Sequence, residues 1–259
     1  MKLPVNPFLA AIRGGQPQIG LWASLASNYA AEVVAGAGYD WVLVDMEHSP
    51  GNVMTTLGQL QAIAPYPSTA IVRTPWNDAV MVKRLLDIGA PGLLFPMVQS
   101  VAEARAAVAA TRYPPDGIRG VAGSIRANRF GRITDYYARV GDETGVLIQL
   151  ETQAAIDQAA AIAAVNGVDG IFFGPADIAA DMGLIGQPMH ADVWARIMPA
   201  ARKLMDAGMP VGTLVTDPGF AAELLNNGFT FVACGTDTGL LAKGADQLLA
   251  QMREMTKET

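Results

Sequence analysis

The chain has 259 residues, of which 51% are apolar, and its formal net charge is −6. This length suits one large domain, which we expect over residues 1–259, and the negative charge argues against nucleic acid or an anionic membrane as a partner. A single cysteine, Cys234, excludes an internal disulfide and a multi-cysteine zinc site.

The amino-terminal residues 1–7 lack the long apolar stretch of a secretory signal. Nowhere does the sequence contain an uninterrupted run of about 18 apolar residues, which a spanning helix would need. We therefore expect a cytoplasmic protein without a membrane-spanning helix.

Apolar runs typical of strands alternate with helical runs along the chain. The eight predicted strands lie near 18–23, 40–45, 70–73, 92–96, 146–150, 169–173, 210–214 and 230–234. Ala-rich amphipathic stretches between them, such as 101–111, 152–164 and 194–207, are predicted as helices. Apolar and polar residues alternate little within these strands. This is expected when helices cover one face of the sheet and the packed barrel interior covers the other. Eight such units predict an α/β fold, a closed (β/α)8 TIM barrel, which typically needs about 250 residues.

One connection, 113–140, is longer than a single helix requires. It contains four arginines, which are Arg119, Arg126, Arg129 and Arg132. Long connections at the strand ends of a barrel often form lids or interface elements. A solvated basic loop is the other interpretation, and both stay open.

Two strands of this pattern lead into a carboxylate. Glu151 follows the run 145–150, and Asp177 follows the run 170–176. The carboxyl ends of barrel strands form the active-site face, and two carboxylates from neighbouring strands suit Mg²⁺ or Mn²⁺. Acids favoured by a helix dipole would explain each carboxylate separately. That alternative does not explain why other polar residues gather at the same end.

Those other polar residues come from the second and third strands. Asp45, Glu47 and His48 crowd the end of the second strand, and an imidazole beside carboxylates is a natural general base. Arg73 ends the third strand, where a guanidinium could hold a carboxylate or neutralise an enolate oxygen. A structural ion pair is the alternative role for Arg73. Asp87, in the following helix, is a candidate to orient His48.

The turn 174–177 combines a tight bend with a predicted helix start. The backbone N–H groups of Ala176 and Asp177 would there face an anion. A Schiff-base mechanism needs a desolvated lysine, usually on a barrel strand. No lysine lies on a predicted strand, so carbonyl chemistry would need a metal as electron sink. The lysines are Lys2, Lys83, Lys203, Lys243 and Lys257.

Taken together, the motifs resemble the HpcH/HpaI aldolase family over nearly the whole chain. They occupy 20–22, 45–50, Arg73, 112–120, 149–152 and 174–177. The resemblance implies a metal-dependent (class II) pyruvate aldolase on a barrel of the phosphoenolpyruvate/pyruvate superfamily type. Such an enzyme cleaves 4-hydroxy-2-oxoacids, for example 4-hydroxy-2-oxoheptanedioate to pyruvate and succinic semialdehyde. It also implies a role in the catabolism of aromatic compounds and a homo-hexamer, a trimer of dimers that exchange their last helix.

The resemblance also implies roles for single residues around a divalent metal, Mg²⁺ or Mn²⁺ with Co²⁺ as a further candidate. Glu151 and Asp177 match the metal ligands, and the amides of Ala176 and Asp177 match the groups that hold the pyruvate carboxylate. Gln149 matches a residue near the metal and the pyruvate oxygens. His48 matches the base, oriented by Asp87.

On the acceptor side, Arg73 matches the residue that stabilises the enolate and polarises the incoming carbonyl. Asp45 matches a residue linked to aldehyde binding and subunit contact. Trp22, Val121 and Leu214 are candidates for the acceptor pocket, with plain barrel packing as the alternative for Val121 and Leu214.

Two departures from the family pattern lie near the expected aldehyde side. Met46 stands where many relatives have glycine, and the segment 123–126 is one residue shorter. The acceptor preference therefore stays open.

Two rival functions would use the same end of the barrel. A citramalyl- or malyl-CoA lyase would need a basic groove, for which Arg126, Arg129 and Arg132 are the candidates. A catalytically silent metabolite-binding barrel is the other, and the intact set of His48, Arg73, Glu151 and Asp177 argues against it.

Overall fold

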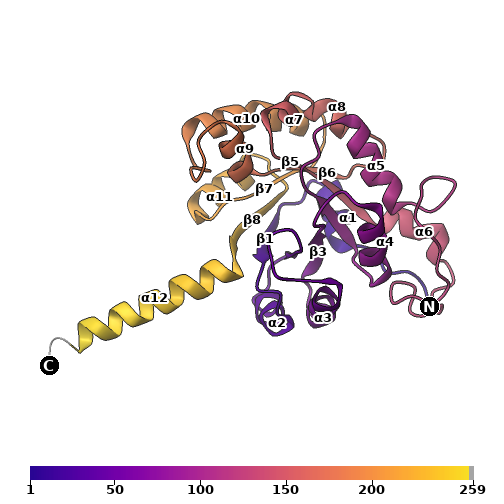
Figure 1. Cartoon of the computed structure of the whole chain (residues 1–259), viewed down its shortest axis with the longest axis horizontal. Helices are drawn as coiled ribbons and strands as arrows, with labels where there is room; N and C mark the ends of the chain where they lie inside the picture. Colours follow the sequence, from indigo (N-terminus) through magenta and orange to yellow (C-terminus); the bar gives the residue numbers. More distant parts are fainter. Residues whose placement is uncertain (257–259) are drawn as a thin grey trace.

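A closed barrel of eight parallel strands forms the centre of the computed structural model, which describes residues 1–256 (Figure 1). The strands follow one another in chain order, and β1 pairs with β8 to close the barrel. The eight strands predicted from the sequence are confirmed, with each boundary within two residues of the prediction. They are β1 (Gln18–Ala23), β2 (Trp41–Asp45), β3 (Thr69–Arg73), β4 (Gly92–Phe95), β5 (Gly145–Leu150), β6 (Gly170–Phe173), β7 (Val211–Leu214) and β8 (Phe231–Thr236).

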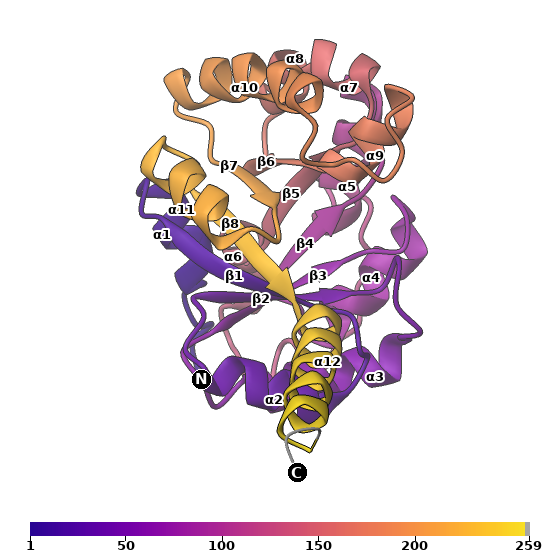
Figure 2. The ribbon, with the colours of Figure 1, turned by 90° about the vertical axis from the view of Figure 1, so that its left-hand side faces the viewer.

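Most of the helices form a ring around the barrel (Figures 1 and 2). The predicted helix over 152–164 is two short helices, because the chain turns at Gln158. The helices are α1 (Pro7–Arg13), α2 (Asn28–Gly36), α3 (Val53–Ile63), α4 (Ala79–Asp87), α5 (Val101–Thr111), α6 (Tyr136–Glu143), α7 (Gln153–Asp157), α8 (Ala159–Ala163), α9 (Pro175–Asp181), α10 (Ala191–Asp206), α11 (Pro218–Asn226) and α12 (Asp237–Met255).

Helix α1 closes the amino-terminal end of the barrel. The side chain of Asn6 caps it by accepting a hydrogen bond from the backbone N–H of Leu9 at 3.1 Å. The ring centroid of Phe8 lies 5.5 Å from that of Trp41 and 5.7 Å from that of Phe231, so the helix seals the interior with aromatic contacts. Gly20 leaves the space for Trp41, because a Cβ there would lie 2.2 Å from the indole ring. With this end filled, the carboxyl ends of the strands remain for a site.

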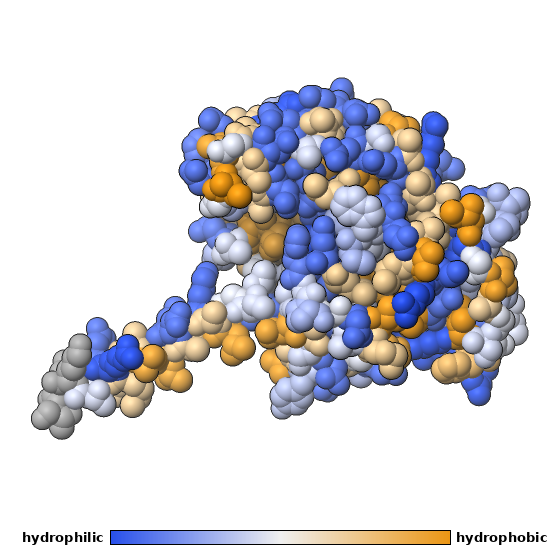
Figure 3. All heavy atoms as spheres, in the orientation of Figure 1, coloured by the Kyte–Doolittle hydropathy of each residue, from blue (hydrophilic) through white to orange (hydrophobic). Residues whose placement is uncertain are grey.

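The last helix, α12, leaves the barrel and extends away from it (Figures 1 and 2). Asp237 is its one buried residue, and the carboxylate of Asp237 accepts hydrogen bonds from the backbone N–H groups of Ser24 and Leu25. Apolar side chains lie exposed along the rest of the helix, as the orange atoms in Figure 3 show. They are Leu240, Leu241, Leu248, Leu249, Met252 and Met255. Among residues 1–256, no helix combines the length and apolar character needed to cross a bilayer.

The long connection after α5 is attached to the barrel by two of its arginines, while residues 120–124 and 129–132 are exposed. Arg119 is buried and its Nη2 donates to a carboxylate oxygen of Asp87 at 2.7 Å, while Arg126 donates to the carbonyl of Ile88. Both contacts lie at the carboxy-terminal end of α4. These two contacts hold Arg119 and Arg126 at the amino-terminal half of the barrel.

Candidate active site

Arg73 lies at the centre of a buried ion-pair network at the ends of β2 and β3. These strands pair so that Asp45 lies opposite Arg73. The guanidinium donates from Nε to Asp45 Oδ1 at 2.8 Å and from Nη2 to Asp45 Oδ2 at 2.7 Å, a bidentate contact. Its Nη1 lies 2.7 Å from Glu47 Oε2. The ring of Trp22 lies 4.9 Å from the guanidinium carbon, so three groups fix the orientation of this arginine.

The pKa values of the two carboxylates that hold Arg73 are shifted in opposite directions. Burial alone would raise the pKa of Asp45, but the hydrogen bonds and charge of Arg73 outweigh it and hold that pKa below its ordinary value. Burial raises the pKa of Glu47, and the charges of Arg73 and His48 offset this only in part. Sequence reasoning gave Glu47 no role. Its position two residues after Asp45 was the available signal, because both carboxylates of this short stretch reach Arg73.

Glu151 is buried just beyond the end of β5 with hydrogen bonds to both carboxylate oxygens. Oε1 accepts from the side-chain amide of Gln149 at 2.7 Å, and Oε2 accepts from the backbone N–H of Met97 at 2.6 Å. Met97 has φ of 52°, a left-handed conformation that is uncommon outside glycine. Gly174 leaves room for the group, because a Cβ there would lie 2.8 Å from Glu151 Cγ. A backbone donor such as the N–H group of Met97 cannot be predicted from the pattern of side chains in the sequence.

Burial raises the pKa of Glu151 to about 8. The hydrogen bond from Met97 acts in the opposite direction, whereas the neighbouring charges of Asp177 and Glu47 raise the pKa further. Three carboxylates thus share one small region, with Arg73 as a partial counter-charge. A divalent cation would balance the negative charge of this region and would favour the ionised form of each carboxylate.

Asp177 lies in the first turn of α9, and Gly174 begins that helix without a side-chain cap. Among residues 1–256, no cluster of three or more His, Cys, Asp or Glu side chains forms a metal cage. Two carboxylates with open positions fit Mg²⁺ or Mn²⁺, since Mg²⁺ commonly uses one or two carboxylates together with substrate and water. The buried Oε1 of Gln149 has no hydrogen-bond partner among the described residues and could accept from such a water. The donor set therefore fits the expected metal.

A cavity of about 280 Å³ lies at the carboxyl ends of the strands, bordered by Arg73, Gln149 and Asp177. The side chains of Glu151, Asp45 and Glu47 do not line it; Glu151 lies behind Gln149, and the other two lie behind Arg73. His48 borders it, with 68% of the side chain exposed and its Nε2 4.0 Å from Glu47 Oε2. Ala176 and Asp177 border it as well. The structure thus brings together most of the residues singled out from the sequence, and their chemical roles stay predictions. Those that line the cavity are Trp22, His48, Arg73, Gln149, Ala176, Asp177 and Leu214.

Two predicted site residues lie elsewhere in the chain. Asp87 is the last residue of α4, where Arg119 binds its carboxylate, so the predicted His48–Asp87 pair does not form within one chain. The two residues are apart because α4 runs from the carboxyl ends of the strands back toward the amino-terminal half of the barrel, and Asp87 lies at its far end. Val121 is 66% exposed in the long connection after α5 and does not line the cavity. It therefore contributes nothing to the acceptor pocket of its own chain.

The two departures from the family pattern also lie away from the cavity. Met46 is buried in the core between the strands and the helices. In the segment 123–126, Arg126 contacts the end of α4 through Ile88. Neither Met46 nor the segment 123–126 borders the cavity of its own chain, and their link to the acceptor preference stays a prediction.

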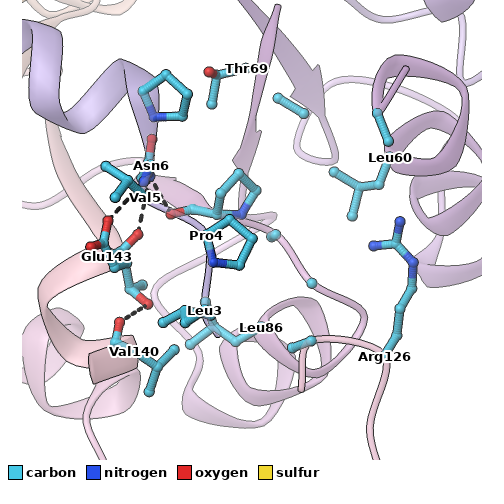
Figure 4. A pocket seen from close by; sticks show the side chains of 18 of the residues that line it. Leu3, Pro4, Val5, Asn6, Leu60, Thr69, Leu86, Arg126, Val140 and Glu143 are labelled. Atoms are coloured by element: carbon cyan, nitrogen blue, oxygen red, sulfur yellow. Dashed lines mark hydrogen bonds between the residues drawn. The ribbon is translucent and has the colours of Figure 1, made fainter. Parts of the chain in front are cut away.

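A second cavity, of about 310 Å³, lies at the amino-terminal ends of β3, β4 and β5 (Figure 4). Asn6 and Glu143, two of the polar residues that border it, are paired with each other and with the backbone. The Asn6 amide donates to the carbonyls of Pro91 and Glu143 at 2.9 and 3.1 Å, and its backbone N–H donates to the Glu143 carboxylate at 2.7 Å. The cavity borders none of the residues around Glu151. The 280 Å³ cavity is therefore the candidate active site.

Known proteins resemble this chain over most of its length. The sequence model of the HpcH/HpaI aldolase/citrate lyase family matches residues 18–244. A 4-hydroxy-2-oxo-heptane-1,7-dioate aldolase of Salmonella paratyphi B is 53% identical over 247 residues, which is 95% of this chain and 94% of that protein. The crystal structure of an HpcH/HpaI aldolase/citrate lyase family protein from Burkholderia cenocepacia superposes with a TM-score of 0.92 at 38% identity and covers 96% of this chain and all of that one. An HpcH/HpaI aldolase from Desulfitobacterium hafniense gives a TM-score of 0.88 at 28% identity, covering 95% and 96% of the two chains.

The raised pKa of Glu151 predicts that the metal-free protein loses stability as the pH rises from about 5 to about 8. In that window the folded state holds a proton on Glu151 that the unfolded chain, with a glutamate pKa near 4.5, has released. The unfolding free energy therefore falls with pH, by an amount on the order of a few kcal/mol. Urea unfolding of the protein in the presence of EDTA, repeated at several pH values, measures this change in the unfolding free energy.

Glu151→Gln keeps this side chain neutral at every pH and should flatten the profile. Glu223→Gln, at an exposed position of α11, should leave it as in the parent protein. Parallel profiles for the parent protein and Glu151→Gln would show that Glu151 ionises in its ordinary range.

Proposed function

Because the chain belongs to the HpcH/HpaI aldolase/citrate lyase family, we propose that it is a class II pyruvate aldolase that acts on 4-hydroxy-2-oxoacids. The observation that carries the proposal is the buried Glu151, whose raised pKa and nearby Asp177 call for a cation. The name of the Salmonella relative points to 4-hydroxy-2-oxoheptanedioate as a substrate. Cleavage between C3 and C4 of that compound gives pyruvate and succinic semialdehyde.

Glu151 and Asp177 would hold the divalent cation, which we take to be Mg²⁺ or Mn²⁺. When bound there, the cation supplies a Lewis acid that polarises the keto group of an oxoacid and makes its methyl protons acidic. The N–H groups of Ala176 and Asp177, at the start of α9, would bind the pyruvate carboxylate. Gln149 supplies an amide donor to Glu151 and leaves its buried carbonyl oxygen for the substrate side.

His48 and Arg73 handle the proton and the developing charge. In the cleavage direction, an imidazole nitrogen of His48 accepts the C4 hydroxyl proton, the C3–C4 bond breaks, and its electron pair becomes the enolate of pyruvate. The aldehyde leaves with the former C4, and a proton is then delivered to C3. Arg73 is held by Asp45 and Glu47 so that its guanidinium borders the cavity. Such a fixed cation stabilises the enolate oxygen without reorganising during the reaction.

The alternative of a CoA-thioester lyase finds less support. The cavity at the amino-terminal ends of the strands is bordered by Arg126 and Arg129, two of the three candidate arginines. A CoA nucleotide bound there would be separated from Glu151 and Asp177 by the barrel. Action in the cytoplasm and a place in aromatic catabolism remain predictions from the sequence.

Metal removal tests the function directly. Pyruvate alone, in D₂O with enzyme and Mg²⁺ or Mn²⁺, should exchange its methyl protons, followed by NMR. Chelation should slow the exchange roughly 100-fold or more, because the cation contributes several kcal/mol to stabilising the enolate, and adding the metal back should restore it. A catalytically silent barrel would show no exchange at all. Full exchange after thorough chelation would remove the metal from the mechanism, and cleavage of acyl-CoA substrates alone would favour the lyase.

The exposed face of α12 supports the expected homo-hexamer, in which dimers exchange this helix. Six apolar side chains, from Leu240 to Met255, lie exposed on a helix that is anchored only at its first turn. Contiguous exposed apolar surface of this kind is typical of an interface. A second copy of the chain is the occupant that we propose, because the same helix recurs in every copy.

Two charges placed on this face should therefore separate the subunits. We expect Leu241→Glu combined with Leu248→Glu to shift the mass measured by light scattering from a hexamer toward smaller species. The control, Lys243→Glu, changes an exposed residue off the apolar face and should keep the hexamer. A parent protein that is monomeric at micromolar concentration would contradict the proposal.

A further inference from the structure

The start of α12 lies beside the end of β1, the strand that carries Trp22. Strand β8 runs directly into α12 (Figure 2), and it pairs with β1 out of step near the active site. Gly20 lies opposite Ala233, whereas Trp22 lies opposite Thr236, so β8 contains one extra residue between the two pairs. An extra residue of this kind is a bulge, which re-aims nearby side chains. The backbone position of Trp22 is therefore set where β8 becomes α12.

Asp237, the residue after Thr236, holds the chain that follows Trp22. Only 6% of Asp237 is exposed, and its two carboxylate oxygens accept hydrogen bonds from the backbone N–H groups of Ser24 at 2.9 Å and Leu25 at 3.1 Å. An ionised acceptor makes such bonds stronger than a neutral one does. An aspartate in the first turn also stabilises its helix through the dipole. That effect alone would not require contacts with the end of β1.

The turn that leaves β1 depends on contacts of this kind. Ala26 has φ of 53°, a left-handed conformation that is unfavourable for alanine. The chain is held on both sides of this residue, by Asp237 before it and by α2 after it. The hydroxyl of Ser27 caps α2 by accepting from the N–H of Ala30 at 3.2 Å. Strained backbone persists where its surroundings fix it. Without the bonds to Asp237, the segment 24–26 would relax and the end of β1 would move with it.

Trp22 transmits this position to the active site. Its indole N–H donates to Asp45 Oδ2 at 3.3 Å, and its ring lies 4.9 Å from the guanidinium carbon of Arg73. Asp45 is itself the bidentate partner of Arg73. A displaced indole would therefore disturb Arg73 in two ways, through the ring contact and through the orientation of Asp45.

We propose that Asp237 is a positioning residue of the active site, which fixes the end of β1 so that Trp22 holds Arg73 where the enolate oxygen forms. The inference rests on the proposed aldolase function and adds a residue that does not border the cavity. Asp237 acts through Trp22, and this separates its role from a contribution to the stability of α12 alone.

Asp237→Asn tests this role with little change of shape. One oxygen remains as an acceptor, but the amide nitrogen is a donor, so one of the two backbone N–H groups loses its partner. With Mg²⁺ and the complete enzyme, we expect the rate of pyruvate methyl exchange at saturating pyruvate to fall about tenfold, because a small displacement of a catalytic group is costly. The KM for pyruvate should stay within about twofold, since the metal and the N–H groups of α9 bind it. Asp192→Asn, at an exposed position in the first turn of α10, should behave as the parent does.

A double-mutant cycle shows whether the effect passes through Trp22. Trp22→Phe removes the indole N–H and weakens the ring contact with Arg73. Adding Asp237→Asn to Trp22→Phe should then lower the exchange rate by less than about twofold more. Losses that multiply in the double variant would show that the two residues act independently and would overturn the proposal. A parent-like rate in Asp237→Asn would overturn it as well.

Circular dichroism and light scattering show whether each variant folds and assembles as the parent does. If Asp237→Asn does not fold, Asp237→Glu keeps the charge and moves the carboxylate by one methylene group. A lower rate at an unchanged KM is expected there too, and a parent-like rate would contradict the role. Absence of exchange in the parent enzyme with metal present would overturn the proposed function, whereas exchange in the parent with unaltered rates in the Asp237 variants would overturn this inference alone.

Discussion

The site depends on an excess of buried negative charge that the protein does not neutralise by itself. Glu151 is buried near Asp177 and Glu47, and the guanidinium of Arg73 is divided between Asp45 and Glu47. Like charges in a poorly solvated region push a carboxylate toward its protonated form, which explains the raised pKa of Glu151. A divalent cation reverses this balance. The protein thus pays a cost in the metal-free state for a site prepared to bind the metal.

Several structural details make sense only around this charge. The left-handed backbone at Met97 aims an N–H group at Glu151, and the missing side chain of Gly174 lets the carboxylate approach. At the other end of the barrel, α1 and its aromatic contacts fill the interior. One end of the barrel therefore supplies packing and the other supplies chemistry, which is the usual division in this fold.

The sequence predicted the fold well because parallel barrel strands are short, continuous apolar runs that differ clearly from the amphipathic helices between them. Helix α1 was missed because its seven residues are too few to show a helical period. The sequence wrongly placed Asp87 beside His48, because the position of a residue in a predicted helix does not show which end of the barrel that residue faces. Nine helical residues at 1.5 Å each carry it about 13 Å from the start of α4, away from His48. The contact of Met97 with Glu151 depends on backbone conformation, which the sequence pattern does not encode. Glu47 could have been found from its position two residues after Asp45.

The most direct test of the account is a titration of the metal-free protein with Mn²⁺, in which electron paramagnetic resonance measures the free ion. We expect one tightly bound ion per chain, and an Mn²⁺ affinity at least about 100-fold weaker when Glu151→Gln and Asp177→Asn are combined, because both expected ligands lose their charge. Glu223→Gln should bind as the parent does. Equal Mn²⁺ affinity in the parent and the double variant would contradict the claim that these two carboxylates hold the metal.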